Sequence, residues 1–394
     1  MGRGRGAERR GVRQTRRVNA MQPLVSSAPD LHYLEQALAR AGVRSSSAID
    51  VAIEPLDGGR TGASVTRLTT LAAGGERRSF VLKVVPAKPW RASLGMDSVE
   101  ARLWLSAATQ MLPAGLRCPT IDVAAHATSG DWWILMQDVS HGILPRGAYD
   151  ETKAHALLRA LARMHARYWG RDDELAALPL ASFEASADAL AALSAHVARG
   201  DAAAEPWLAG IAQDFRVNGA MLPLFLDALP PADADFYLQL CCDHARISRA
   251  LARYPRTLLH GDLRRANIAF VDRDVVLFDW ELASCGPAAR DLQWYWFLQF
   301  WAYPPRDGRT PDDRRGGLGE YLESLERARG CEIDRDGFDQ SCELAWLSVF
   351  CQIGFCLADP LTDSAPSADA IARAKRTSAE AIELARRLEE RHVR

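Results

Sequence analysis

The segment from Leu258 to Glu281, LLHGDLRRANIAFVDRDVVLFDWE, decides the fold of this chain. Three polar residues, Asp262, Asn267 and Asp279, stand in it beside apolar runs that are typical of strands. The runs IAFV and VVLFD are joined by the short turn DRD, which predicts a β-hairpin. Asp and Asn also favour turns, so three unrelated turn residues are the alternative. We expect the polar residues to converge at the strand ends, while their apolar neighbours anchor the strands in the core.

The spacing of these residues matches a known motif. His260, Asp262 and Asn267 follow the pattern H-x-D-x-x-x-x-N, and D-W-E follows at Asp279. Protein kinases carry H-R-D-x-x-x-x-N and then D-F-G. With Gly261 in place of the arginine, the segment resembles the catalytic loop and metal-binding segment of the aminoglycoside phosphotransferase and choline kinase-like family, the small-molecule relatives of protein kinases.

The resemblance implies a role for each polar residue. Asp262 would accept or orient the proton of an acceptor hydroxyl group, and Asn267 and Asp279 would bind Mg²⁺, with His260 as structural support. Magnesium prefers carboxylate, amide and phosphate oxygens as ligands. Phosphoryl transfer needs the acceptor held in line with the γ-phosphate and the phosphate charge neutralised. The implied cofactors are ATP and Mg²⁺.

The other parts of a kinase site occur upstream in the required order. Lys83 lies in the apolar run FVLK, and Glu100 lies at the start of the next predicted helix. The resemblance implies that Lys83 holds the α- and β-phosphates and that Glu100 holds Lys83. The turn that contains Gly58, Gly59 and Gly62 falls where the family has its phosphate-covering loop. It is not a full G-x-G-x-x-G, and a plain hairpin turn is the alternative.

Three further elements match the family. The run Met136 to Val139 should form the hinge, where backbone groups of Gln137 and Val139 would bind the nucleotide base. His165, in the run LARMHARYWG, is interpreted as a buried structural residue and not as a catalyst. Asp291 is expected to brace the catalytic loop by hydrogen bonding, without touching the substrate.

The acceptor should be a small molecule. Only eleven residues separate Asp279 from Asp291, and no A-P-E motif follows, so there is little room for the activation segment of a protein kinase. Aromatic residues between 293 and 304, including Trp294 and Phe297, could line the acceptor site or pack in the core. Arg314 and its neighbours mix with acidic residues, which argues against a polycationic acceptor; Arg314 would bind an anionic group or lie in a solvated loop.

The order of predicted elements indicates an α+β fold with two lobes. The resemblance implies that this fold is protein-kinase-like. Residues 21–138 should form a small N-terminal lobe with a leading helix, an antiparallel sheet and one further helix. Residues 139–394 should form a larger, mostly helical lobe that carries the catalytic loop and the acceptor site. Its predicted helices include 235–254 and 290–301. Residues 1–20 hold seven arginines and almost no apolar residue, which predicts a disordered basic tail, with Met21 as an alternative start.

Composition excludes several classes of protein. The chain has 394 residues, 48% of them hydrophobic and 25% charged, and a net charge of −2. These values are ordinary for a globular protein and give no reason to expect a nucleic acid, a membrane or an obligate protein partner. No apolar run approaches the roughly 20 residues that span a bilayer. Eight scattered cysteines without metal-like spacing indicate a cytoplasmic protein with free thiols.

The sequence therefore predicts an ATP-dependent phosphotransferase that acts on a hydroxyl group of a small molecule. Two alternatives stay open at this point. One is a protein kinase-like enzyme with a protein acceptor, which the short segment after Asp279 disfavours. The other is a non-catalytic nucleotide-binding module, which is disfavoured because every expected catalytic position is filled.

Overall fold

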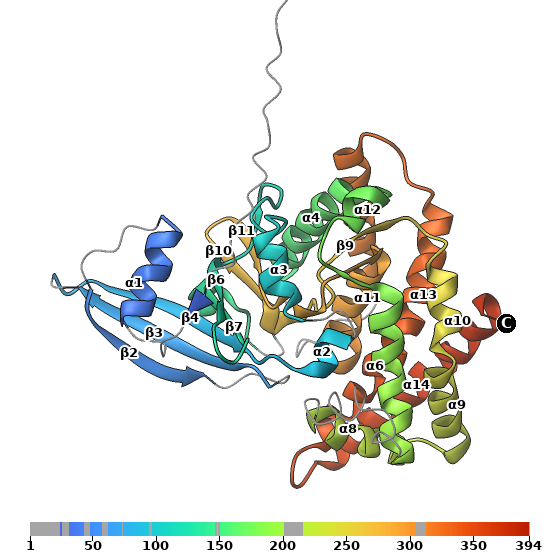
Figure 1. Cartoon of the computed structure of the whole chain (residues 1–394). Helices are drawn as coiled ribbons and strands as arrows, with labels where there is room; N and C mark the ends of the chain where they lie inside the picture. Colours follow the sequence, from blue (N-terminus) through green and yellow to red (C-terminus); the bar gives the residue numbers. More distant parts are fainter. Residues whose placement is uncertain are drawn as a thin grey trace, which may run out of the picture.

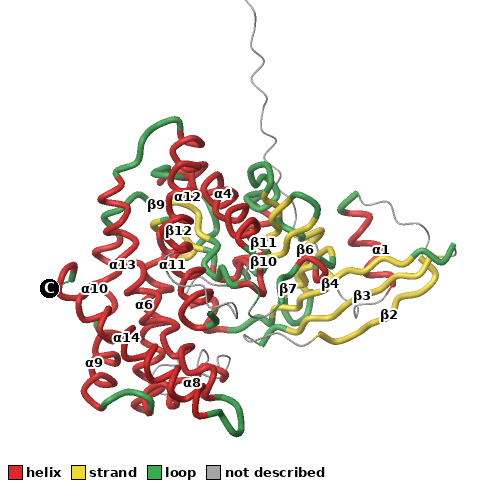
Figure 2. Tube along the Cα trace, turned by 180° about the vertical axis from the view of Figure 1, so that it is seen from behind, coloured by secondary structure: helices red, strands yellow, loops and turns green. Residues whose placement is uncertain are grey.

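We analysed a computed structural model of the chain. It describes residues 24–25, 31–42, 48–56, 62–72, 74–93, 97–145, 148, 150–200, 216–304 and 313–393. At 24, 25, 31, 48, 49, 90, 93, 216–220 and 313–316 only the backbone is described. The predicted basic tail at residues 1–20 lies outside the described residues. Strands dominate the N-terminal part and helices the C-terminal part (Figure 1), and the view from behind shows the same division (Figure 2), which confirms the predicted α+β class with two lobes.

The N-terminal lobe is built on a six-stranded sheet. Its strands are β1 (Leu24–Val25), β2 (Ala48–Leu56), β3 (Ser64–Ala72), β4 (Arg77–Val85), β6 (Thr120–His126) and β7 (Trp132–Gln137). Their order in the sheet is β1-β6-β7-β4-β3-β2, and all neighbours are antiparallel except β1 and β6. The predicted antiparallel sheet is confirmed: β2, β3 and β4 form a meander, and β7 inserts between β4 and β6. The helices of this lobe are α1 (Leu31–Arg40), α2 (Pro89–Ser93) and α3 (Val99–Leu105).

Helices cover both faces of the sheet, which explains why its central strands are almost continuously apolar. Phe80 and Leu82 of β4 share a core with residues of α1, whereas Val85 shares a core with Ala101 of α3. Successive side chains of a strand point to opposite faces. Lys83 therefore lies on the face of β4 that α3 covers, which is the face toward the predicted site.

The C-terminal lobe is mostly helical around one large core. Its helices are α4 (Glu151–Tyr168), α5 (Asp172–Ala176), α6 (Phe183–Arg199), α8 (Arg216–Asp227), α9 (Pro231–Cys242), α10 (His244–Leu251), α11 (Ala289–Trp296), α12 (Asp313–Arg329), α13 (Arg335–Ile353) and α14 (Ala368–His392). Shorter helical turns are η1 (Ser140–Gly142), η3 (Arg265–Asn267), η4 (Trp280–Leu282), a π-helical turn η5 (Phe297–Ala302) and η6 (Gly354–Leu361). The rings of Phe225, Tyr237 and Phe350 pack edge to face in the centre of this core.

The segment from Leu258 to Glu281 lies among short strands of the larger lobe. They are β5 (Leu116–Arg117), β8 (Ala181–Ser182), β9 (Arg256–Leu259), β10 (Ile268–Val271), β11 (Asp274–Leu277) and β12 (Ser284–Pro287). β10 and β11 form the predicted hairpin, in which Val271 pairs with Asp274 and Ile268 with Leu277. β5 pairs with β11, so a strand from residues 21–138 joins a sheet of the helical lobe and ties the two lobes together.

Several predicted helices have different limits in the structure. The helix expected at 235–254 is two helices that meet at Asp243, and the helix expected at 290–301 changes to a π-helical turn at Phe297. The short helix α2 and the long helix α6 were not predicted. α6 was missed because its Ala- and Ser-rich sequence gives only a weak apolar stripe.

The stretch Arg335–Leu361 is long and apolar enough to span a membrane by composition alone. In the structure 78% of its most apolar window is buried against the rest of the protein. It includes Phe350, which contacts four other aromatic rings of the core. The stretch is therefore the central core helix of the larger lobe, and its apolar composition follows from that position.

Asp138 fastens the segment after β7 to the sheet. Its Oδ2 atom accepts hydrogen bonds from Arg67 Nε and Ser79 Oγ, both at 2.9 Å, and its Oδ1 atom accepts one from the backbone N–H of Ser140 at 3.0 Å. Burial raises the pKa of Asp138, but the hydrogen bonds from Ser140, Ser79 and Arg67 outweigh burial and lower the pKa to about 2. The carboxylate thus joins the predicted hinge to strands β3 and β4.

The hydrogen bonds of the Asp138 carboxylate make the stability of the protein depend on pH. The pKa of Asp138 is lower in the folded protein than its ordinary value of 3.8, so its contribution is full above about pH 4 and is lost as the pH falls toward 2. We expect Asp138→Asn to lower the free energy of unfolding by about 1–2 kcal/mol at neutral pH. Urea unfolding at several pH values should show the difference from wild type shrinking below pH 4.

The matched control is Glu54→Gln. Glu54 also pairs with Arg67, at 2.9 Å, but its side chain is 65% exposed. An exposed ion pair contributes little, so this variant should unfold like the wild type. A difference for Asp138→Asn that stays constant from neutral pH to pH 2 would contradict the assignment.

Candidate active site

The open end of the β10–β11 hairpin brings Asn267 and Asp279 together, as the sequence predicted. The residues next to the paired strand ends are linked by the backbone bond from Phe278 N–H to the Asn267 carbonyl, at 3.2 Å. Asp279 has a positive φ of 64°, a conformation that Asp tolerates better than most residues and that is common at functional sites. Asn267 is 2% exposed, and its side-chain nitrogen donates to the carbonyl and the carboxylate of Asp262. Its amide oxygen is therefore the atom that can bind a cation.

Both carboxylate oxygens of Asp262 are oriented by donors. Oδ1 accepts a hydrogen bond from the indole N–H of Trp294 at 3.0 Å. Oδ2 accepts from Asn267 Nδ2 at 2.9 Å and from Arg264 Nε at 3.1 Å. Side chains held in this way keep a fixed direction, which a group that handles a proton in a transition state requires.

Asp291 braces the catalytic loop. This fully buried carboxylate accepts the backbone N–H groups of His260 at 2.8 Å and Gly261 at 2.9 Å, and it lies 3.3 Å from His165 Nε2. Burial would raise the pKa of Asp291, but His165, His260 and the Gly261 N–H lower it. His165 is itself fully buried and contacts the Tyr321 hydroxyl at 2.8 Å. These positions fit the supporting roles that were predicted for Asp291 and His165.

His260 links the catalytic loop to the metal-binding segment. Its Nε2 atom donates to the Phe278 carbonyl at 3.1 Å, and its Nδ1 atom accepts the backbone N–H of Asp262 at 3.3 Å. One imidazole therefore fixes the residue before Asp279 and the backbone of Asp262 at once. The ring also packs on Trp280, with 4.5 Å between centroids.

Lys83 lies at the centre of a buried ion cluster. Its Nζ atom is 2.7 Å from Glu100 Oε2 and 2.6 Å from Asp279 Oδ1. Burial would lower the pKa of Lys83, but Asp279 and Glu100 raise it, so the amine stays charged. Burial would likewise raise the pKa of Asp279, but Lys83 and Arg264 lower it to about 2. The cluster joins β4, α3 and the D-W-E segment, as the sequence predicted for Lys83 and Glu100.

Glu281, the last residue of D-W-E, adds a third carboxylate that the sequence analysis did not assign. It lies 3.9 Å from Lys83 and 3.4 Å from Arg91 Nη1. Burial raises the pKa of Glu281 to about 7, which Lys83 and Arg91 offset only in part and Glu100 increases. The only sequence signal was a charged residue where protein kinases have the glycine of D-F-G.

Arg264 is a second site residue that was missed. Its guanidinium lies 3.1 Å from Asp262 Oδ2 and 3.7 Å from Asp279 Oδ2, so it bridges the predicted base and a predicted metal ligand. Burial would lower the pKa of Arg264, but Asp262 and Asp279 raise it. Its place two residues after Asp262 was visible in the sequence, but the direction of its side chain was not.

The donor set fits a magnesium ion held together with a nucleotide. Asp279 supplies a carboxylate and Asn267 an amide oxygen, and Mg²⁺ is usually held by one or two such groups with phosphate oxygens. Within the described ranges no group of three or more His, Cys, Asp or Glu side chains is arranged to hold a metal by itself. The site would therefore need the oxygens of its substrate to complete the coordination of a cation.

The structure places the remaining predicted nucleotide-binding residues as follows. Gln137 ends β7, and its side chain accepts a hydrogen bond from Arg117 at 2.9 Å. Val139 is buried against Ala269 and Val276 of the larger lobe. Gly62 precedes β3 with a positive φ of 78°, whereas the predicted phosphate-covering residues Gly58 and Gly59 lie outside the described residues.

The residues predicted for the acceptor site divide into three kinds. Trp294 is 4% exposed and contacts Asp262 directly. Phe297 is fully buried and packs against Trp301, Trp346 and Phe350, which supports core packing over acceptor contact. Arg314 lies in the first turn of α12, and its side chain lies outside the described part of the chain.

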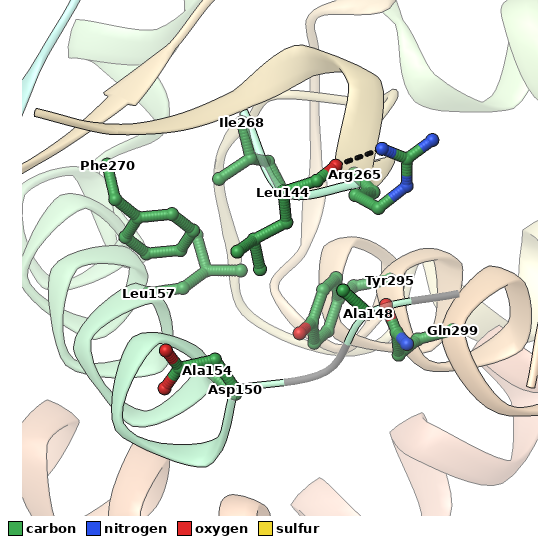
Figure 3. A pocket seen from close by; sticks show the side chains of 10 residues that line it. All are labelled: Leu144, Ala148, Asp150, Ala154, Leu157, Arg265, Ile268, Phe270, Tyr295 and Gln299. Atoms are coloured by element: carbon green, nitrogen blue, oxygen red, sulfur yellow. Dashed lines mark hydrogen bonds between the residues drawn. The ribbon is translucent and has the colours of Figure 1, made fainter. Parts of the chain in front are cut away.

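A small cavity lies beside the catalytic loop, between the start of α4 and the end of α11 (Figure 3). Its volume is about 20 Å³, room for about one water molecule and not for an acceptor. Arg265 lies at its edge and donates to the Leu144 carbonyl, as the dashed line shows. The other lining residues are Ala148, Asp150, Ala154, Leu157, Ile268, Phe270, Tyr295 and Gln299.

An oriented carboxylate at Asp262, the oxygen groups of Asn267 and Asp279, and a lysine–glutamate pair that faces them from the other lobe are the arrangement expected of a phosphotransferase with a kinase-like fold. Comparison with family models agrees, because residues 53–331 match the phosphotransferase enzyme family called APH. The chain belongs to this family, which confirms the predicted relationship and the predicted class of enzyme. No individual curated protein sequence matches the chain.

Solved structures with the same fold include two small-molecule kinases. The amicoumacin kinase hAmiN, in complex with AMP-PNP, Ca²⁺ and Ami, is 14% identical, with a TM-score of 0.50 over 89% of this chain and 93% of that one. The choline kinase from Cryptosporidium parvum Iowa II is 10% identical, with a TM-score of 0.50 over 92% of this chain and 98% of that one. At these identities the similarity shows the fold.

The catalytic loop depends on a glycine at position 261. Gly261 has φ +84°, and a Cβ atom there would lie 1.9 Å from the Leu282 carbonyl oxygen. We expect Gly261→Ala to lower the free energy of unfolding by about 2–4 kcal/mol, because both the backbone and the contact are strained. Chemical denaturation of the two proteins measures the difference.

Gly319→Ala is the matched control. Gly319 lies within α12 with nothing within 4 Å of an added Cβ atom. Alanine should stabilise this helix by about 0.5–1 kcal/mol. Equal effects of the two substitutions would show that the close approach of Gly261 to Leu282 does not hold the loop.

Proposed function

We propose that the protein transfers the γ-phosphoryl group of ATP to a hydroxyl group of a small molecule. The observation that carries this proposal is one continuous set of contacts: Asp262 to Asn267 at 2.9 Å, Asp262 through Arg264 to Asp279, and Asp279 to Lys83 at 2.6 Å. The predicted base, the predicted metal ligands and the predicted phosphate-binding cation thus converge where the two lobes meet. This arrangement can position phosphates and an acceptor without covalent chemistry by the protein.

Each residue has a definite task in this proposal. Asp279 and the amide oxygen of Asn267 would hold Mg²⁺, which neutralises charge on the phosphate oxygens when it is bound. Lys83, kept in place by Glu100, would bind phosphate oxygens. Asp262 would accept the proton of the acceptor hydroxyl as the oxygen attacks, in a direction fixed by the donors on both of its carboxylate oxygens.

The solved structures support the nucleotide and the metal. The amicoumacin kinase with the same fold holds an ATP analogue and a divalent cation. The charges around Asp262 further suggest the acceptor class. Its nearest charged neighbour is Arg264, and the buried Arg290 also acts on it electrostatically. Such surroundings repel polycations, so we propose a neutral or anionic hydroxyl compound as the acceptor.

A protein acceptor is the less favoured alternative. After Asp279 the chain forms the helical turn η4 and then β12, which pairs with both β9 and β8. The segment that carries the peptide-docking activation loop in protein kinases is therefore short here and paired into the larger lobe.

The test is a screen for ADP release from ATP and Mg²⁺ across hydroxylated compounds: sugars, amino alcohols, macrolides, steroids and aminoglycosides. We expect activity with a neutral or anionic compound, and Asp262→Asn should reduce kcat by roughly 10²- to 10⁴-fold. The same substitution should leave the affinity for ATP unchanged within about threefold, because Asp262 is not expected to bind the nucleotide.

The matched control is Asp274→Asn, on the same hairpin. Asp274 is an exposed carboxylate that lies 3.5 Å from Arg117, and its loss should leave kcat unchanged. If Asp262→Asn kept wild-type activity, the role that we propose for Asp262 as the acceptor of the hydroxyl proton would be wrong. If no compound were phosphorylated while ATP still bound, the non-catalytic nucleotide-binding alternative would replace the proposal.

A further inference from the structure

A buried cation lies behind the catalytic aspartate without a carboxylate partner. Arg290, in α11, is 4% exposed, and it makes no ion pair among the described residues. Its Nη2 atom donates to Gln352 Oε1 at 2.8 Å, while Nε and Nη1 have no hydrogen-bond partner in the part of the chain that the structure describes. Burial lowers the pKa of Arg290 to about 9, which Asp291 and Asp262 partly offset, so the group is charged at neutral pH. Burying an unpaired charge is costly. An apolar residue would fill the same space without this cost, so packing alone does not explain an arginine at position 290.

One side chain, that of Trp294, contacts both the cation and Asp262. The guanidinium carbon lies 4.1 Å from the centroid of the Trp294 ring, which is a close cation–π contact. The indole N–H of Trp294 donates to Asp262 Oδ1 at 3.0 Å. A cation on the face of the indole draws electron density from the ring and strengthens the N–H as a donor. The position and strength of the bond to Oδ1 therefore depend on Arg290.

Arg290 is held in turn by a chain of buried polar groups. The Gln352 amide nitrogen donates to Ser348 Oγ at 2.9 Å, and Ser348 Oγ lies 2.9 Å from His244 Nε2. His244 Nδ1 lies 2.6 Å from Asp188 Oδ1. The chain crosses α13, α10 and α6 and ends at Arg290, so it holds the guanidinium through its Nη2 atom. Ser348 is fully buried, which excludes a separate hydrolytic role for the Ser–His–Asp set.

We propose that Arg290 is a positioning residue for phosphoryl transfer, which acts by holding the indole of Trp294 and so fixing Asp262 Oδ1. This inference rests on the proposed function, because the direction of Asp262 matters to the rate only if Asp262 handles the acceptor proton. Arg290 itself touches neither the nucleotide nor the acceptor. A small displacement of a reacting group lowers the rate strongly, so a residue behind the site can control kcat.

The experiment is a double-mutant cycle of Arg290→Met and Trp294→Phe, with kcat and KM measured on the acceptor that the screen identifies. Arg290→Met should lower kcat by roughly 10- to 100-fold with little change in KM for ATP. Trp294→Phe keeps a ring but removes the donor, so in that background Arg290→Met should change kcat by less than about threefold. Arg290→Lys, which keeps a cation, should restore part of the rate. Equal losses in both backgrounds, or a rise in KM with kcat unchanged, would overturn the proposal.

Arg386→Met is the matched control. Arg386 also lies 4.1 Å from an aromatic centroid, that of Phe236, and bonds to Asp233, but it belongs to α14. Its loss should leave kcat unchanged. If Arg290→Met does not fold, Gln352→Leu tests the same point, because it removes the acceptor that holds Arg290 and should lower kcat in the same selective way.

A second readout needs no acceptor and separates this inference from the proposed function. The chain has 11 tryptophans, and the indole N–H resonance that disappears in Trp294→Phe belongs to Trp294. That resonance should shift in Arg290→Met and in Asp262→Asn and should stay in place in Arg386→Met. An unchanged resonance in Arg290→Met overturns the positioning contact whether or not transfer is found. A shifted resonance in a protein without transfer activity would sustain the contact and reject only the proposed reaction.

Discussion

The structure depends on one buried ammonium group. Lys83 Nζ pairs with Glu100 from the N-terminal lobe and with Asp279 from the C-terminal lobe, at 2.7 and 2.6 Å. Each of these charges would be costly to bury alone, and the pair of Lys83 with Asp279 forms only where the two lobes meet. Since the same three residues are the predicted phosphate and metal groups, the contact that joins the lobes is also the contact that builds the site.

The charges then form a gradient across the site. Around Lys83, three carboxylates, Glu100, Asp279 and Glu281, surround one ammonium, with Arg91 at the edge. Around Asp262 the neighbouring cations are Arg264, which is in contact with it, and Arg290, which contacts the ring of Trp294. The first environment suits a divalent cation with phosphates, and the second orients Asp262 beside an acceptor. Phosphoryl transfer depends on both charge neutralisation and positioning of the acceptor.

Local sequence patterns predicted the parts of this account that depend on strand periodicity and short spacing. Lys83 was identifiable because it lies in an apolar strand at the place in the chain that the resemblance implies, and Asn267 and Asp279 because their spacing matches the motif and a tight hairpin joins them. The roles of Arg264, Trp294 and Arg290 depend on helix packing between segments far apart in the chain, which no local pattern encodes. Phe297 illustrates the limit: helical spacing placed it beside Trp294, but only the position of α13 shows that it is enclosed by Trp346 and Phe350.

The central claim is that the interlobe ion cluster is a binding site for ATP with magnesium, and calorimetry tests it most directly. ATP would be titrated with and without Mg²⁺ into the wild type and into Asp279→Asn, which keeps the size of the side chain and removes its charge. The account predicts that Mg²⁺ strengthens ATP binding by roughly tenfold or more in the wild type and much less in the variant. An equal effect of Mg²⁺ on both proteins would contradict it.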